Sequence, residues 1–225
     1  MAANTPGSAR GSAPRPAAPP AALAAAAAEL LAFLLDHLAT RPGWHVAPDR
    51  VRCPDGRVVA LGADQPLATA GRLVAEDLCL LLRDEAAGEH RLAAGFLAFP
   101  ASWTLREKLG RPLGAVHAPV AEYDRTLARR VQRMLDLLRP GRGLWRANAL
   151  IYADPDLHQP RAEGAPRPPA PPGGRRWLRS ERQCLIKLPK SGAIVFSIHT
   201  TVVPLERLDA DDRAALAARA GPAVT

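Results

Sequence analysis

The sequence predicts an α+β fold in which an antiparallel sheet of about five strands is flanked by helices. Strand-like segments occur in pairs joined by short turns, which is typical of antiparallel hairpins. Segments with apolar residues at helical spacing lie between these pairs. The chain has 225 residues, of which 48% are hydrophobic, enough for one domain with a packed core.

The N-terminal part predicts a tail followed by a helix. Residues 1–22 are rich in proline and alanine and contain too little apolar bulk to fold, so we expect a disordered tail. Residues 23–39 carry leucines at helical spacing, and Pro42-Gly43 ends this helix. Polar residues interrupt its apolar run: Glu29, Asp36 and His37. We therefore expect a helix of a soluble protein and no membrane span.

Two hairpins are predicted next. Short strands around Val51 and at 58–61 flank Pro54-Asp55-Gly56, a sequence typical of a turn. Residues 76–83 and 91–99 are apolar and are separated by a polar stretch, so they predict a second antiparallel pair.

Two helices follow this hairpin. Ser102 is predicted to cap a short helix over residues 103–109 that Gly110 ends. Residues 122–138 predict a longer helix. Its inner stripe consists of Leu127, Val131, Leu135 and Leu138, and its outer stripe of Arg125, Arg129 and Arg133.

Three strands complete the predicted sheet, at 144–151, 178–188 and 193–203. The last two form a hairpin around Pro189-Lys190-Ser191-Gly192, and Asp209 caps a final helix that ends at Gly221-Pro222. Residues 153–177 contain seven prolines and predict a disordered loop within a single domain spanning residues 23–220.

Composition limits the function classes. The net charge of +8 invites a nucleic-acid interpretation, but the arginines are scattered and aromatic residues make up only 4%, so we expect no nucleic-acid partner. The cysteines are few and widely spaced: Cys53, Cys79 and Cys184. This pattern favours neither disulfides nor zinc, and we expect a reduced, cytoplasmic setting.

The sequence contains no motif for binding nicotinamide or a nucleoside triphosphate, and none of a zinc protease or a serine hydrolase. Candidate functional residues are therefore identified one at a time. His117 lies in a proline-bounded loop after a cationic helix, where either a haem ligand or a hydrogen-bonded surface histidine is compatible with the pattern. His199 and Cys184 are further ligand candidates. Arg182 lies on an apolar strand face and needs an anionic partner such as Glu76, Asp77 or a ligand carboxylate.

Four blocks of sequence together resemble a known family. They are residues 73–81, residues 99–120, Trp145-Arg146-Ala147-Asn148 and residues 179–205. In this order, over about residues 23–208, they are similar to the alpha-subunit-like family of haem-dependent oxidative N-demethylases, which includes dimethylamine monooxygenase.

The resemblance implies a PAS-like fold that binds haem b and uses dioxygen to remove a methyl group from a small secondary amine as formaldehyde. It implies partner subunits of the reductase or ferredoxin type, which pass electrons from NADPH through flavin and iron–sulfur components. It makes His117 the preferred axial ligand of the haem iron.

The resemblance also implies roles for other motif residues. Basic residues expected to pair with haem propionates are Lys108, Arg111, Arg146 and Arg182. Acidic residues of which one is expected to hold the cationic amine are Glu76, Asp77 and Glu181. Two alternatives remain beside the enzyme: a non-catalytic PAS-like haem-binding or sensing module, and a basic interaction protein.

Overall fold

A computed structural model of the chain describes residues 20–62, 65–118, 123–166 and 172–219. It contains two antiparallel sheets, and the larger one has the strand order β5-β4-β8-β7-β6. The strands of this sheet are β4 Glu76–Asp84, β5 Glu89–Phe96, β6 Leu144–Tyr152, β7 Trp177–Lys187 and β8 Ile194–Pro204. The small sheet consists of β1 His45–Val46, β2 Arg50–Arg52 and β3 Val58–Ala60. The predicted α+β class and the five-stranded antiparallel sheet are confirmed.

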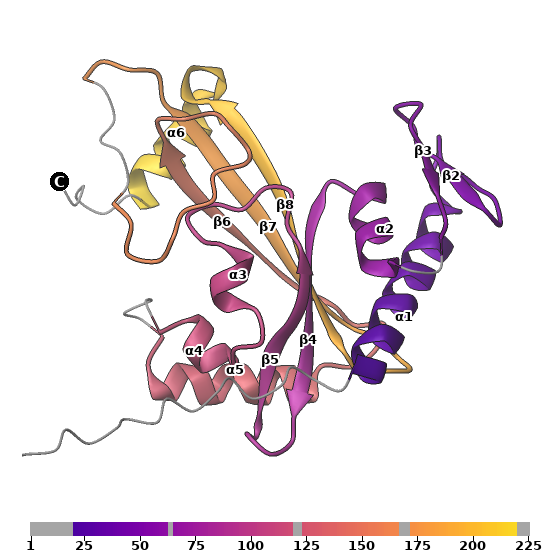
Figure 1. Cartoon of the computed structure of the whole chain (residues 1–225). Coiled ribbons are helices and arrows are strands. Elements are labelled where there is room, and N and C mark those ends of the chain that lie inside the picture. Colours follow the sequence, from indigo (N-terminus) through magenta and orange to yellow (C-terminus); the bar gives the residue numbers. More distant parts are fainter. Residues whose placement is uncertain (1–19, 63–64, 119–122, 167–171, 220–225) are drawn as a thin grey trace, which may run out of the picture.

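Helices lie on both sides of the central strands (Figure 1). They are α1 Pro20–Leu38, α2 Pro66–Leu73, α3 Leu105–Lys108, α4 Leu113–Val116, α5 Arg125–Leu137 and α6 Ala210–Arg219, with a 3-10 helix at Leu205–Arg207. Figure 1 shows α1 and α2 on one side of β4 and β5, and α3, α4 and α5 on the other.

Cross-strand pairing assigns each side chain to one of two sheet faces, because residues directly opposite each other point the same way. The α1 face carries Glu76, Leu78 and Leu80 of β4 opposite His199, Ser197 and Val195 of β8. The α5 face carries Asp77, Cys79 and Leu81 opposite Ile198, Phe196 and Ile194.

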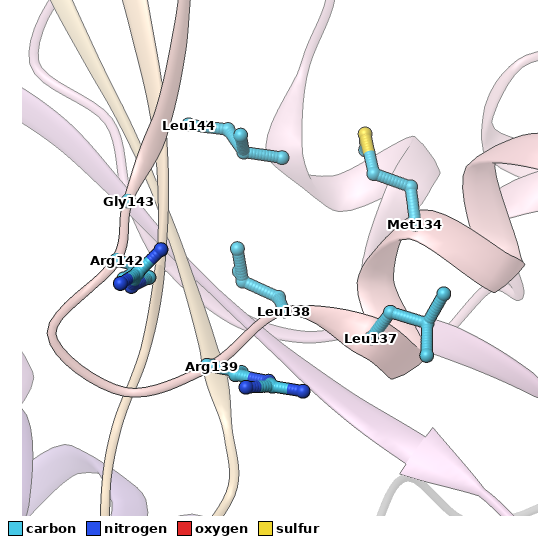
Figure 2. Close-up of a pocket in the computed structure, with 7 residues that line it drawn as sticks. All are labelled: Met134, Leu137, Leu138, Arg139, Arg142, Gly143 and Leu144. Atoms are coloured by element: carbon cyan, nitrogen blue, oxygen red, sulfur yellow. The ribbon is translucent and has the colours of Figure 1, made fainter.

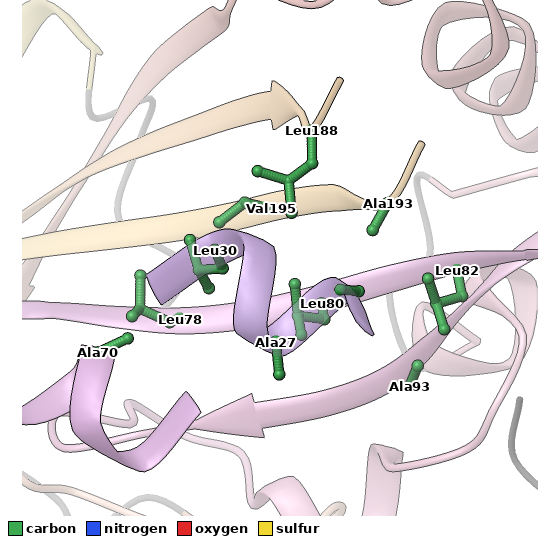
Figure 3. Close-up of a cluster of buried hydrophobic side chains, with 11 residues drawn as sticks. Ala27, Leu30, Ala70, Leu78, Leu80, Leu82, Ala93, Leu188, Ala193 and Val195 are labelled. Atoms are coloured by element: carbon green, nitrogen blue, oxygen red, sulfur yellow. The ribbon is translucent and has the colours of Figure 1, made fainter. Parts of the chain in front are cut away.

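The core on the α1 face is aliphatic. Leu30 of α1 packs against Leu78 and Leu80 of β4 and against Leu188 beyond β7 (Figure 3). Burying each such leucine is worth about 1.5–3 kcal/mol. Helix α1 is also fixed by Glu29, whose carboxylate accepts hydrogen bonds from the turn between β7 and β8.

The core on the α5 face holds the inserted helices. Leu113 of α4 and Leu135 of α5 pack with Cys79, Leu81 and Ile194. Burial raises the pKa of the Cys79 thiol to about 12, so this cysteine is an inert core residue. The same packing fixes the segment between β5 and β6, which contains His117.

Helix α1 corrects two expectations. It begins at Pro20, so residues 20–22 are helical, whereas residues 1–19 of the predicted tail lie outside the described residues. Its segment Ala21–Leu38 is also long and apolar enough to cross a membrane by length and composition, against the expectation that no run is. Only 22% of this segment is buried within the fold, where Leu30 and Leu38 belong to two separate hydrophobic clusters.

The segment 99–110 differs from the prediction at its start. Ser102 does not cap the short helix, because α3 begins at Leu105 after Thr104. Ser102 instead has a left-handed backbone, with φ of +64°. Gly110, at φ +78°, follows the helix as expected.

Disorder is wrong for the first half of the proline-rich loop. Residues 154–166 are hydrogen-bonded to the segment 98–107, while 167–171 lie outside the described residues. The end predicted for the last helix at Gly221-Pro222 also lies outside them.

Four elements were not predicted: β1, α2, α4 and the 3-10 helix at Leu205–Arg207. Helix α2 is only eight residues long and contains Gly71. This glycine allows close packing, because a Cβ atom added there would lie 2.1 Å from Cδ1 of Phe96. Helix propensity alone disfavours glycine, but the contact with β5 requires it.

Gly71→Ala should therefore destabilise the fold by about 1–3 kcal/mol, although alanine is the better helix former. Urea denaturation followed by circular dichroism measures this change. A second substitution, Phe96→Leu, should recover part of the loss, because the smaller side chain makes room for the methyl group. A higher unfolding midpoint for Gly71→Ala would contradict the packing described.

Candidate ligand site around His117

His117 directly follows α4 and is oriented by its own helix. Its Nδ1 lies 2.9 Å from the carbonyl oxygen of Leu113, to which the ring N–H donates. The ring also stacks on Tyr123, with centroids 4.3 Å apart. With Nδ1 donating, the lone pair of the neutral ring is on Nε2, the arrangement that a metal-binding histidine uses.

The surroundings of His117 favour this neutral form. Burial lowers the pKa of His117, and the positive charges of Lys108 and Arg146 lower it further, while the bond to the Leu113 carbonyl opposes them. The lowered pKa favours the uncharged imidazole at neutral pH. A neutral ring is the form that binds iron.

Two cations lie near this ring. Lys108 donates from Nζ to the carbonyl of Val116, 2.6 Å away, and its side chain is only 12% exposed. Arg146 lies on the α5 face of β6, where its Nε donates to Gln183 Oε1 at 2.8 Å. The two come from separate elements and face the same region.

An apolar groove lies where α5 meets β6. It has a volume of about 430 Å³ and is lined by Met134, Leu137, Leu138, Arg139, Arg142, Gly143 and Leu144. Figure 2 shows Met134 of α5 and Leu138, which directly follows this helix, facing Leu144 across the groove, with the two arginines at its edge. Leu144 lies on the same face of β6 as Arg146, two residues before it, while His117 is not among the residues that line the groove.

Two buried hydroxyl groups on this side have no hydrogen-bond partner among the described residues. They are the Tyr123 phenol, stacked on His117, and the Thr200 hydroxyl, on the strand position opposite Glu181. Burial raises the pKa of Tyr123, so its phenol keeps the proton as a donor. Buried polar groups are normally paired, so these two hydroxyls are available to a ligand.

The segment that carries His117 is clamped where it leaves β5. Asp77 Oδ1 accepts hydrogen bonds from the backbone N–H of Ala98 (2.6 Å) and of Phe99 (2.9 Å). Arg179, which is 2% exposed, donates to the carbonyls of Phe99 (2.7 Å) and Leu157 (3.0 Å). Both contacts of Asp77 therefore hold the backbone at Ala98 and Phe99.

A chain of polar contacts links this clamp to the region of His117. Glu181 pairs with Arg179 at 3.3 Å and accepts from Gln183 Nε2 at 3.1 Å, and Gln183 in turn holds Arg146. All four side chains lie on the α5 face of β6 and β7. Of the three acidic candidates, only Glu181 is on this face and partly exposed.

The other predicted residues gather on the opposite face. Glu76 Oε1 lies 3.2 Å from Nδ1 of His199 and 3.9 Å from Arg182. Arg182 thus has one of its expected partners. The prediction that the Arg182 side chain is buried is wrong, because this side chain is 60% exposed. The register puts Arg182 on the α1 face, whose helices cover the other end of the sheet. Cys184 lies on this α1 face too.

Arg111 is the last of the predicted basic residues. It lies 3.9 Å from Glu163, as Lys108 does at 3.7 Å, so one carboxylate joins the two cations. The structure therefore brings together His117, Lys108, Arg111 and Arg146, and it separates them from Arg182.

The side chains present fit a haem group. A neutral histidine and nearby cations match an iron ligand and two carboxylates, respectively. In the described part of the chain, no group of three or more His, Cys, Asp or Glu side chains could hold a bare metal ion. An axial haem ligand requires only one such residue.

Sequence reasoning missed Arg179, Tyr123 and Glu163. Strand alternation offered a signal for Arg179, because it lies on the face opposite Arg182 and two residues before Glu181. Tyr123 follows residues outside the described part, and Glu163 lies in a segment expected to be disordered.

A protein-family model described as haem-dependent oxidative N-demethylase, alpha subunit-like, matches residues 17–221. The match covers most of the chain, including both sheets and the region of His117.

Replacing Asp77 tests the clamp. Asp77→Ala leaves two buried N–H groups unpaired and should cost about 2–4 kcal/mol of unfolding free energy. Asp77→Asn keeps an oxygen at the same place. Because burial raises the pKa of Asp77 despite its hydrogen bonds, loss of the charge should cost less than half as much. Urea denaturation compares the variants, and equal losses would contradict the assignment.

Proposed function

The chain belongs to the haem-dependent oxidative N-demethylase alpha subunit-like family, and from this premise we propose that it binds haem b through His117 and oxidises a small secondary amine. The methyl group would leave as formaldehyde, with dioxygen as oxidant. The single observation that carries the proposal is the neutral, oriented imidazole of His117 beside two cations.

Bound haem supplies the iron at which dioxygen is activated. The protein's own part is to orient the axial ligand, and the Nδ1–H bond to Leu113 does this for His117. Lys108, Arg111 and Arg146 would pair with the haem carboxylates. Arg182 lies on the opposite face, so the α5-face cations are the better candidates.

Glu181 is the residue we propose for holding the amine. A secondary amine is a cation at pH 7, and a carboxylate near the site attracts it. Glu181 lies on the α5 face, whereas Glu76 lies on the α1 face and Asp77 holds the backbone at Phe99. Both oxygens of Glu181 already have partners, so the amine would share this carboxylate with Arg179 and Gln183.

Electrons would come from NADPH through separate flavin and iron–sulfur proteins, since the sequence carries no nicotinamide motif. We propose that an acidic iron–sulfur partner approaches α5. The exposed side of this helix carries arginines without a carboxylate within 4 Å among the described residues: Arg125, Arg129, Arg130 and Arg133. Such a surface attracts an acidic protein over distance.

The alternative is a haem-binding sensor module of the same fold that does not catalyse demethylation. The observation in its favour is that Asp77 and Glu181 are both engaged in hydrogen bonds within the fold. Formaldehyde release from dimethylamine, with a chemical or protein electron donor, separates the two.

The first test is the visible spectrum of the protein titrated with haemin. A Soret band should develop in the wild type, and His117→Ala should weaken haemin binding at least about tenfold, since even residues that only orient an iron ligand are worth that much. His199→Ala is the matched control, because His199 lies on the other face of the sheet. Loss of the band in His199→Ala with retention in His117→Ala would reverse the assignment.

The second test concerns the amine. In the haem-loaded protein, dimethylamine should shift the Soret band, and Glu181→Gln should weaken the apparent affinity about tenfold, the usual worth of a hydrogen bond to a charged group. Glu76→Gln removes the same charge on the α1 face and should leave the affinity unchanged. An equal effect of both substitutions would remove Glu181 from the proposed role.

A further inference from the structure

Residues 154–166, which we call the strap, cross the segment 98–107 and are bound to it through residues 158–163. The hydrogen bonds join His158 Nδ1 to Ala98 O (2.9 Å), Gln159 N to Pro100 O (2.9 Å), Ser102 N to Gln159 O (3.0 Å), Arg161 Nη2 to Ser102 Oγ (2.8 Å) and Glu163 N to Glu107 Oε1 (3.1 Å). A proline-rich segment without secondary structure is thus held by side chains and isolated backbone contacts.

Near its end, the strap contacts two cations of the candidate site, Lys108 and Arg111. Glu163 Oε2 lies 3.7 Å from Lys108 Nζ and 3.9 Å from Arg111 Nη1. Lys108 is only 12% exposed, and a cation so far removed from water requires an anion nearby. Glu163 is the only carboxylate within 4 Å of Lys108 among the described residues.

The contact also holds a strained residue. Ser102 has φ of +64°, a conformation that costs a residue with a Cβ atom free energy. Strap residues hold it there, through Gln159 to its backbone N–H and through Arg161 to its hydroxyl. Release of the strap would allow Ser102 to relax, so the closed arrangement depends on the contacts that oppose this strain.

We propose that the strap is a displaceable cover and that Glu163 is an internal carboxylate that holds Lys108 and Arg111 until a carboxylate of haem replaces it. The inference rests on the proposed function, because it assigns a haem carboxylate to these cations. Both anions compete for one pair of cations, so each binds at the expense of the other. Haem loading then opens the strap, and the closed strap lowers haem affinity.

Trypsin reports the state of the strap in the full-length protein, since the bond between Arg161 and Ala162 lies inside it. In the haem-free protein, Glu163→Gln should speed cleavage at this bond about two- to fivefold, the range for a partly exposed ion pair. Mass spectrometry identifies the fragment that begins at Ala162. The matched control is Glu206→Gln, which breaks the ion pair with Arg175 outside the strap.

Haemin provides the second measurement. It should speed cleavage after Arg161 in the wild type and have a smaller effect in Glu163→Gln, whose strap is already released. Haemin affinity from the Soret titration should rise about two- to fivefold in Glu163→Gln and stay unchanged in Glu206→Gln. His117→Ala with haemin controls for effects of haemin on trypsin.

The outcomes separate the two proposals. A Soret band together with unchanged cleavage in Glu163→Gln, or with protection of the Arg161–Ala162 bond by haemin, would overturn the strap and leave the proposed function intact. No Soret band in either the wild type or Glu163→Gln would overturn the proposed function, and the displacement with it.

Discussion

The buried contact of Asp77 and Arg179 with the backbone at Phe99 is the interaction on which the rest of the site depends. Asp77 binds the N–H groups there, and Arg179 binds the carbonyl groups of Phe99 and Leu157. One arginine therefore fixes both the start of the segment that leads to His117 and the segment that covers it. Charged side chains so deeply buried are tolerated because each has several partners.

The two faces of the sheet carry different parts of the structure. The α1 face carries most of the aliphatic core, and its open end holds the Glu76, His199 and Arg182 cluster. The α5 face receives the helices inserted between β5 and β6 and gathers the cations around His117. Because neighbouring residues of a strand point to opposite faces, Glu76 and Asp77 have unrelated surroundings.

Hydrophobic alternation and turn residues were sufficient to predict the five-stranded sheet, since both are local signals. Burial of individual charges was not predictable, because it depends on which end of a face the helices cover. Arg182 was therefore expected to be buried and is exposed, while Arg179 on the other face is the buried arginine. The order of residues 154–166 depends on contacts with a segment about 60 positions earlier, and composition carries no signal of such contacts.

The arginine-rich side of α5 has a consequence for how the protein responds to its solution conditions. A guanidinium group keeps its charge far above physiological pH, whereas clusters of histidine or lysine would titrate. Attraction between this helix and an acidic surface therefore depends on ionic strength, because salt screens charges beyond about 8 Å under physiological conditions. The charge of the helix itself changes little with pH.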